Sequence, residues 1–176
     1  MRLTYRVIVL VLLAAGVAGA QSFDLAGGAG TAAGGGIGGG FWPSVSATAW
    51  PLRYVGINGA FALRAGQENH QGFNFEPLVV DINLAVRPVI LPWTPTLLVG
   101  WAAVQTVTGF DCPAYSLGPC FMSLDAFALH LGVEWTHYVH GRWFVQLEYH
   151  YYHTEFHDGN PSRVAVSFGH TFGRMP

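Results

Sequence analysis

The sequence contains few charged residues. Only 10% of its 176 residues are charged, whereas an ordinary soluble domain has about 25%. Hydrophobic residues make up 51% of the chain. So few charges cannot cover a soluble surface, but a closed membrane barrel is apolar outside and polar inside. The composition therefore favours a membrane β-barrel.

Lysine is absent, because all eight basic residues are arginine. Arg2 and Arg6 precede an apolar run that ends in the small residues Ala18-Gly19-Ala20. This pattern predicts a secretory signal peptide of residues 1–20, whose cleavage leaves a single domain of residues 21–176. The ten acidic residues then outnumber the remaining arginines, which argues against a nucleic-acid partner.

Long apolar runs and cysteine are also scarce. Beyond the predicted leader, no apolar run approaches the roughly 20 residues that a membrane helix needs. The two cysteines, Cys112 and Cys120, enclose the segment PAYSLGP. In an exported chain this pair predicts a disulfide across a loop, with a pair of metal ligands as the alternative.

The sequence does contain repeated alternation of apolar and polar residues. In Trp143–Thr154, the residues Trp143, Val145 and Leu147 fall on one face, and Gln146 and Glu148 on the other. This two-residue period is typical of a β-strand. Similar alternation predicts eight strands, an even number suited to an up-and-down antiparallel transmembrane barrel. The predicted strands are 22–31, 41–50, 53–64, 75–87, 96–108, 124–139, 143–154 and 163–172.

The predicted connections alternate in length. Short reversals near Pro51, Pro92 and Gly141 alternate with longer polar segments. Outer-membrane barrels have short periplasmic turns and longer outer loops, so the longer segments are predicted to face outward. They include the predicted interaction loops 67–74, 111–123 and 157–162.

With its leader, eight alternating strands and a last strand ending at Phe172, the chain resembles small eight-stranded outer-membrane proteins such as the opacity proteins and the transmembrane domain of OmpA. The resemblance implies a bacterial outer-membrane location, with outer-membrane lipid, lipopolysaccharide and the barrel-assembly machinery as partners. It also implies a non-enzymatic structural or surface-interaction role, a loop ligand outside the cell, and no cofactor. A narrow pore and a soluble lipocalin-like carrier are alternatives.

Polar residues on the inward faces are predicted to fill the barrel. Small barrels are packed inside with side chains, so these residues should hydrogen-bond to one another and leave no wide pore. Glu134 and Glu148 lie at equal offsets from the turn at Gly141, which should bring them together. Paired carboxylates also suggest acid–base catalysis, provided that a substrate can reach them. The predicted polar interior consists of Arg64, Asp81, Asn83, Arg87, His130, Glu134, Gln146, Glu148 and His150.

The outer end of the seventh predicted strand carries His153, Glu155 and His157 on one face. Histidine and carboxylate can bind zinc, although solvated rim residues are the simpler interpretation. The chain also resembles lipid A deacylases, exported eight-stranded barrels with an outward-facing histidine and serine late in the chain, and this resemblance implies an enzymatic alternative in which His153 is the histidine. No serine lies beside His153, so the expected nucleophile is missing. Five tryptophans are predicted to anchor the outer surface in the membrane: Trp42, Trp93, Trp101, Trp135 and Trp143.

Overall fold

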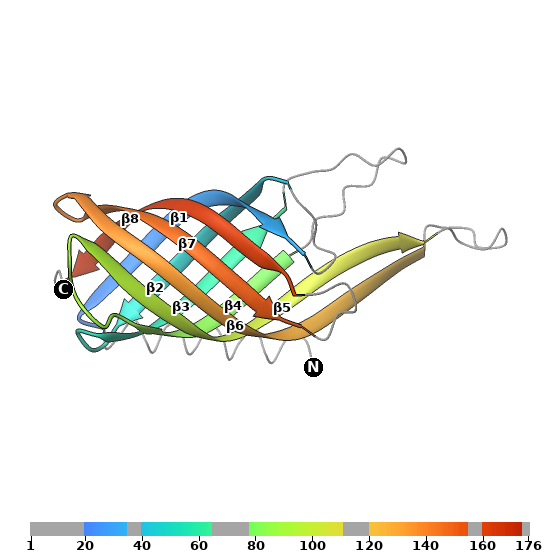
Figure 1. Cartoon of the computed structure of the whole chain (residues 1–176), viewed down its shortest axis with the longest axis horizontal. Helices are drawn as coiled ribbons and strands as arrows, with labels where there is room; N and C mark the ends of the chain where they lie inside the picture. The colour runs from blue at the N-terminus through green and yellow to red at the C-terminus, as the bar shows by residue number, and fades with distance from the viewer. Residues whose placement is uncertain (1–19, 35–39, 65–77, 111–119, 155–159, 174–176) are drawn as a thin grey trace.

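The computed structural model describes residues 20–34, 40–64, 78–110, 120–154 and 160–173, without the side chains of 105–126. These residues form eight strands that close into one antiparallel barrel, with β8 paired back onto β1 (Figure 1). The strands are β1 (Ser22–Ala33), β2 (Trp42–Trp50), β3 (Val55–Leu63), β4 (Leu78–Val86), β5 (Trp93–Phe110), β6 (Cys120–His140), β7 (Trp143–His153) and β8 (Ser162–Gly173). The predicted all-β, eight-stranded antiparallel barrel is confirmed.

The predicted signal peptide falls outside the described residues, apart from its last position, Ala20. In the part of the chain that the structure describes, we find no helix with the length and apolar character needed to cross a membrane.

Side chains alternate between the inside and the outside of the barrel, because successive residues of a strand point to opposite faces. The outward Leu131 of β6 and Leu147 of β7 are each 43% exposed, whereas the inward Glu134 and Glu148 are 3% and 2% exposed. The outer wall is therefore apolar and the interior holds the carboxylates. This is the reverse of the arrangement in a soluble domain.

Three short connections lie at one end of the barrel, which we call the turn end. They join β2 to β3, β4 to β5 and β6 to β7. In the last of these, Gly141 has a φ of 54°, a left-handed conformation that tight hairpin turns require and that glycine adopts without strain. We call the opposite end, where β1, β3, β5 and β7 finish, the loop end. The predicted short reversals are thus confirmed.

At the loop end, β5 and β6 are longer than the other strands. They pair with each other as far as Phe110 and Cys120, beyond their last partners on β4 and β7. The two strands project from the barrel as a two-stranded ribbon (Figure 1). The predicted loop 111–123 is therefore too long, because residues 120–123 belong to β6. Likewise Ser162, predicted to lie in a loop, is the first residue of β8.

The predicted start of β5 after Pro95 is also wrong, because the strand begins at Trp93. Pairing between β4 and β5 reaches only Leu97, so Pro95 has a strand partner on its β6 side alone. A residue without an N–H group is tolerated where one side of a strand has no ladder to donate to.

Apolar side chains fill the interior at the loop end. Trp42 and Tyr152 are fully buried there, and they pack with Val79, Val104 and several alanines. The prediction that Trp42 faces the membrane is wrong, because its position in β2 places it on the inward face together with Ser46. The other four tryptophans predicted to face outward are exposed.

Candidate functional site

The buried polar residues of the barrel form two groups, of which the first lies at the turn end around Asp24 of β1. The Asp24 carboxylate accepts hydrogen bonds from Trp50 Nε1 at 2.7 Å and Thr171 Oγ1 at 2.6 Å, and it pairs with Arg87 Nη2 at 2.5 Å. The Arg87 guanidinium lies 3.5 Å from the centroid of the Trp50 ring. We call these four residues the Asp24 cluster. It links β1, β2 and β8 to the residue that follows β4.

The second group is a chain of hydrogen bonds across the middle of the interior. Asn58 of β3 donates to Thr48 at 2.9 Å and accepts from Asn83 of β4 at 3.0 Å. The Asn83 amide also donates to Asp81 at 2.8 Å. The Asn83 carbonyl oxygen lies 2.5 Å from His130 Nδ1 of β6.

The chain continues through two stacked imidazoles. His130 Nε2 lies 2.9 Å from His150 Nδ1, and the ring centroids are 5.0 Å apart. His150 Nε2 lies 3.2 Å from Glu148 Oε2, which is also 3.4 Å from Arg163 Nη2. Ser167 donates to the other carboxylate oxygen of Glu148. We call the chain from Asn58 to Ser167 the histidine network, and its members come from β3, β4, β6, β7 and β8.

Glu134 and Glu148 are paired across β6 and β7, as the sequence predicts. Their surroundings differ. Glu148 contacts an arginine, a histidine and a serine, whereas Glu134 lines a small polar cavity between the two groups. The cavity measures about 10 Å³, room for about one water molecule, and it is also lined by Asp24, Arg87 and Gln146. A cavity of this size admits no organic substrate to the carboxylate pair.

Of the nine residues predicted for the interior, eight are buried and Arg64 is half-buried near the loop end. Seven of these eight belong to the Asp24 cluster, the histidine network or the Glu134 cavity, and Asp81 accepts a hydrogen bond from Asn83 of the network.

The predicted rim group of three residues is described only in part. His153 is exposed on the outer wall at the end of β7, while Glu155 and His157 fall outside the described residues. The same holds for Cys112, and the side chain of Cys120 is not described, so the disulfide remains a prediction. Ser162, the next serine along the chain after His153, is paired with Tyr151. Among the described residues no hydrogen bond joins Ser162 to His153.

Several buried polar residues were missed by the sequence reasoning. Strand parity alone would have placed Asp24, Asn58, Arg163 and Thr171 on inward faces. The signal for Tyr152 was the same, since it shares a face with His150. A complete list of inward positions, rather than of the most obviously charged ones, would have found them all.

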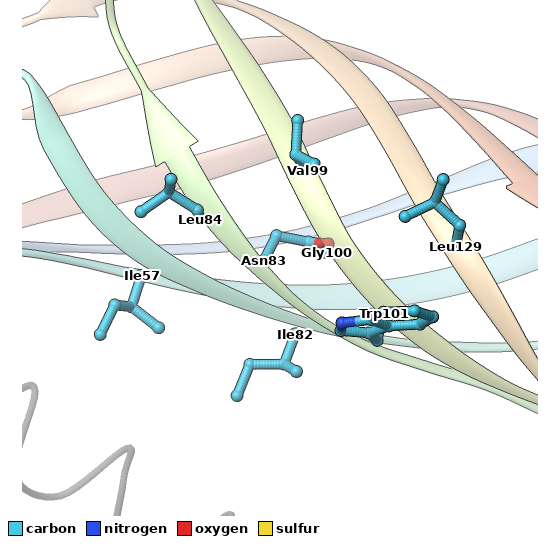
Figure 2. Close-up of a pocket in the computed structure, with 8 residues that line it drawn as sticks. All are labelled: Ile57, Ile82, Asn83, Leu84, Val99, Gly100, Trp101 and Leu129. Atoms are coloured by element: carbon cyan, nitrogen blue, oxygen red, sulfur yellow. The ribbon is translucent and has the colours of Figure 1, made fainter.

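A shallow hollow lies on the outside of the barrel. It measures about 380 Å³ and is lined by apolar side chains that include Leu84, Val99, Trp101 and Leu129 (Figure 2). The buried carboxylates and imidazoles point the other way, into the barrel. The hollow is therefore a shallow depression in the apolar outer wall and does not open onto the buried polar residues.

No protein-family model matches the sequence, and no curated protein is similar to it. Solved structures with a similar fold do exist. The N-terminal β-barrel domain of Pseudomonas aeruginosa OprF matches with a TM-score of 0.62 and 10% identity, over 88% of this chain and 99% of that one. The Yersinia pestis attachment invasion locus protein Ail, solved with the heparin analogue sucrose octasulfate, matches with a TM-score of 0.59 and 13% identity, over 86% and 97%.

Neisserial surface protein A matches with a TM-score of 0.58 and 12% identity, over 87% of this chain and 96% of that one. Each match covers nearly the whole of the solved chain, so no strand of the barrel is left over. Identities this low concern the fold alone. This chain has the fold of the small eight-stranded outer-membrane β-barrels.

Proposed function

We propose that this chain is an integral protein of the bacterial outer membrane, with a closed interior and a structural or surface-interaction role, and that it is not an enzyme. The observation that carries the proposal is the reversed arrangement of side chains. Leu131, Val99 and Phe168 are between 43% and 52% exposed on the wall, while the carboxylates are inside. An apolar wall on a closed barrel suits acyl chains, because no backbone edge remains unpaired in the lipid.

The filled interior argues against a pore. The apolar layer at the loop end contains fully buried Trp42 and Tyr152, and the polar cavity below it holds about one water molecule. Together with the hydrogen-bonded Asp24 cluster, these layers block the interior at the loop end, in the middle and at the turn end. The expected conductance in a planar bilayer is therefore no step above background.

The loop end is where a partner would bind, because the β5–β6 ribbon projects there. The charged residues in the undescribed segments 65–77, 111–119 and 155–159 are all acidic, and these segments contain no arginine. Acidic residues repel polyanions, so the heparin analogue bound to Ail is a poor model for the partner of this chain. A basic or neutral outer partner suits it better.

Cell fractionation combined with unboiled gel migration tests the proposal. The protein should sediment with the outer membrane, require detergent for release, and migrate differently with and without boiling, since a closed barrel resists detergent unfolding. A protein that fractionates in the periplasm without detergent would instead be the soluble, lipocalin-like carrier.

The enzymatic alternative has its own measurement. Mass spectrometry of lipid A from cells with and without the protein should show the same acyl pattern. A change in acyl pattern that disappears in His153→Ala would establish a deacylase and overturn the non-enzymatic role.

A further inference from the structure

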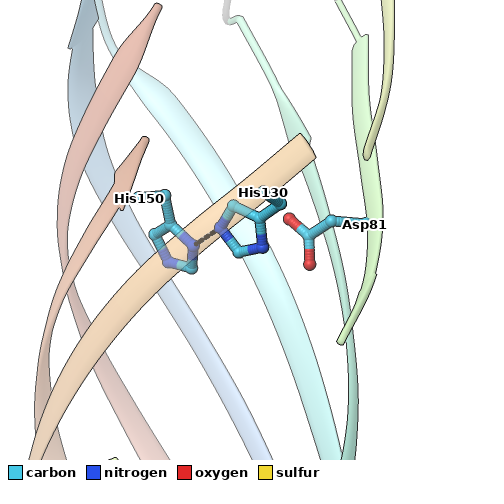
Figure 3. A group of neighbouring side chains, drawn as sticks. All are labelled: Asp81, His130 and His150. Carbon is cyan, nitrogen blue, oxygen red and sulfur yellow. Dashed lines mark hydrogen bonds between the residues drawn. The ribbon is translucent and has the colours of Figure 1, made fainter. Parts of the chain in front are cut away.

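Three side chains that can bind a metal ion meet inside the barrel. Asp81 of β4, His130 of β6 and His150 of β7 each offer a ligand atom, and the three atoms lie within 4.8 Å of one another (Figure 3). The three residues are 4%, 0% and 1% exposed. Their strands are held in register by the barrel, so the backbone already brings the ligands together.

The outer nitrogen of each imidazole faces an oxygen. His130 Nδ1 lies 2.5 Å from the Asn83 carbonyl oxygen, and the Asn83 amide is turned away to donate to Asp81 and Asn58. His150 Nε2 lies 3.2 Å from a carboxylate oxygen of Glu148. Both oxygens accept hydrogen bonds, so each of these nitrogens must carry a proton.

If both rings are neutral, the two inner nitrogens carry no proton and each presents a lone pair. They face each other, since His130 Nε2 and His150 Nδ1 are 2.9 Å apart. Two lone pairs at this distance repel unless a proton, as in a hydrogen bond between an imidazolium and a neutral ring, or a metal ion lies between them. Metal-binding histidines characteristically donate the other ring N–H to a carbonyl or carboxylate, and Asn83 and Glu148 occupy those two positions here.

The charges of the interior also leave a place for a cation. Asp24 pairs with Arg87 and Glu148 with Arg163, but Asp81 makes no ion pair within 4 Å among the described residues. Its contact in the histidine network is the amide of Asn83. A buried carboxylate without a positive partner is costly, typically several kcal/mol.

We propose that Asp81, His130 and His150 bind one divalent transition-metal ion, with zinc as the best-suited ion. Two imidazoles and a carboxylate form a ligand set for such an ion and not for calcium or magnesium, which prefer oxygen. Bonds of about 2.0–2.1 Å place two tetrahedral ligand atoms roughly 3.3 Å apart, so the imidazoles separate by a few tenths of an ångström and Asp81 moves inward. The ion then joins β4, β6 and β7.

Cobalt serves as the probe, because its tetrahedral complexes absorb visible light. The full mature barrel is folded in detergent, stripped with a chelator, loaded with cobalt and passed through gel filtration. The expected result is about one cobalt per barrel with visible absorption, which zinc displaces. Asp81→Asn and His150→Gln should lose the ion, and Asn83→Ala should weaken its binding by about 10- to 100-fold.

His153→Gln is the matched control, since it removes an exposed histidine from the same strand, β7. It should bind cobalt like the unaltered protein. Unboiled gel migration shows whether each variant is folded. Where a variant does not fold, cobalt binding by the unaltered protein decides whether the site exists. The site is refuted if that protein retains no cobalt, or if the interior variants retain it. Loss in His153→Gln alone would place the metal at the rim and equally refute it.

Discussion

Replacing Asp24 with alanine should destabilise the barrel by about 4 kcal/mol. The change leaves the Arg87 guanidinium, which is 3% exposed, without its carboxylate at 2.5 Å. Stranding one member of a buried ion pair costs about 3–5 kcal/mol. Trp50 and Thr171 also lose an acceptor, but the adjacent cavity has room for about one water that can replace it, so little is added.

The measurement is reversible unfolding of the barrel by guanidinium in lipid vesicles, followed by tryptophan fluorescence, to which Trp50 contributes directly. The matched control is the double variant Asp24→Asn with Arg87→Met, which removes both charges at once. It should be destabilised by about 2 kcal/mol less than Asp24→Ala, because no unpaired charge remains. The reasoning fails if Asp24→Ala costs under about 1 kcal/mol, or if the double variant is as unstable as the sum of its single changes.

Three further predictions concern the wall, a turn and the ribbon. Leu147→Arg should cost about 2–4 kcal/mol in a bilayer, whereas Val139→Arg near the turn end should cost about 0–1 kcal/mol; equal costs in vesicle unfolding would argue against a lipid-facing wall. Gly141→Val should lose about 1–2 kcal/mol by the same assay and Gly141→Asn much less, since φ is 54° there. Peptide mapping without reductant should recover Cys112 joined to Cys120, and recovery of both as free thiols would contradict the predicted disulfide.

Much of the fold could be predicted from the sequence because apolar and polar residues alternate one by one along each strand. One side of each strand must suit a crowded interior and the other must suit an apolar surrounding, so parity alone assigns every position to a face. The same logic aligned Glu134 with Glu148, because a short turn fixes the register of its two strands. Strand number, direction and register at this hairpin follow from local chemistry.

The parts that could not be predicted depend on partners elsewhere in the chain. From the sequence, Pro95 looks like a strand breaker. Only the length of β4 shows that β5 has no hydrogen-bonded partner on that side at Pro95. Trp42 reads as a membrane anchor by residue type, although its parity points inward. The meeting of Asp81, His130 and His150 requires the barrel itself, because strands β4 and β7 are not neighbours.

The pairing of β1 with β8 makes the first and last strands that the structure describes neighbours along their full lengths. Until Ser162–Gly173 has been synthesised and docked, an open sheet carries two unsatisfied edges that can recruit other chains. Closure of the barrel therefore requires that β8 has been made and has paired with β1. Chains that lack β8 should therefore aggregate or be degraded, so the steady-state population should contain closed barrels and no chains without this strand.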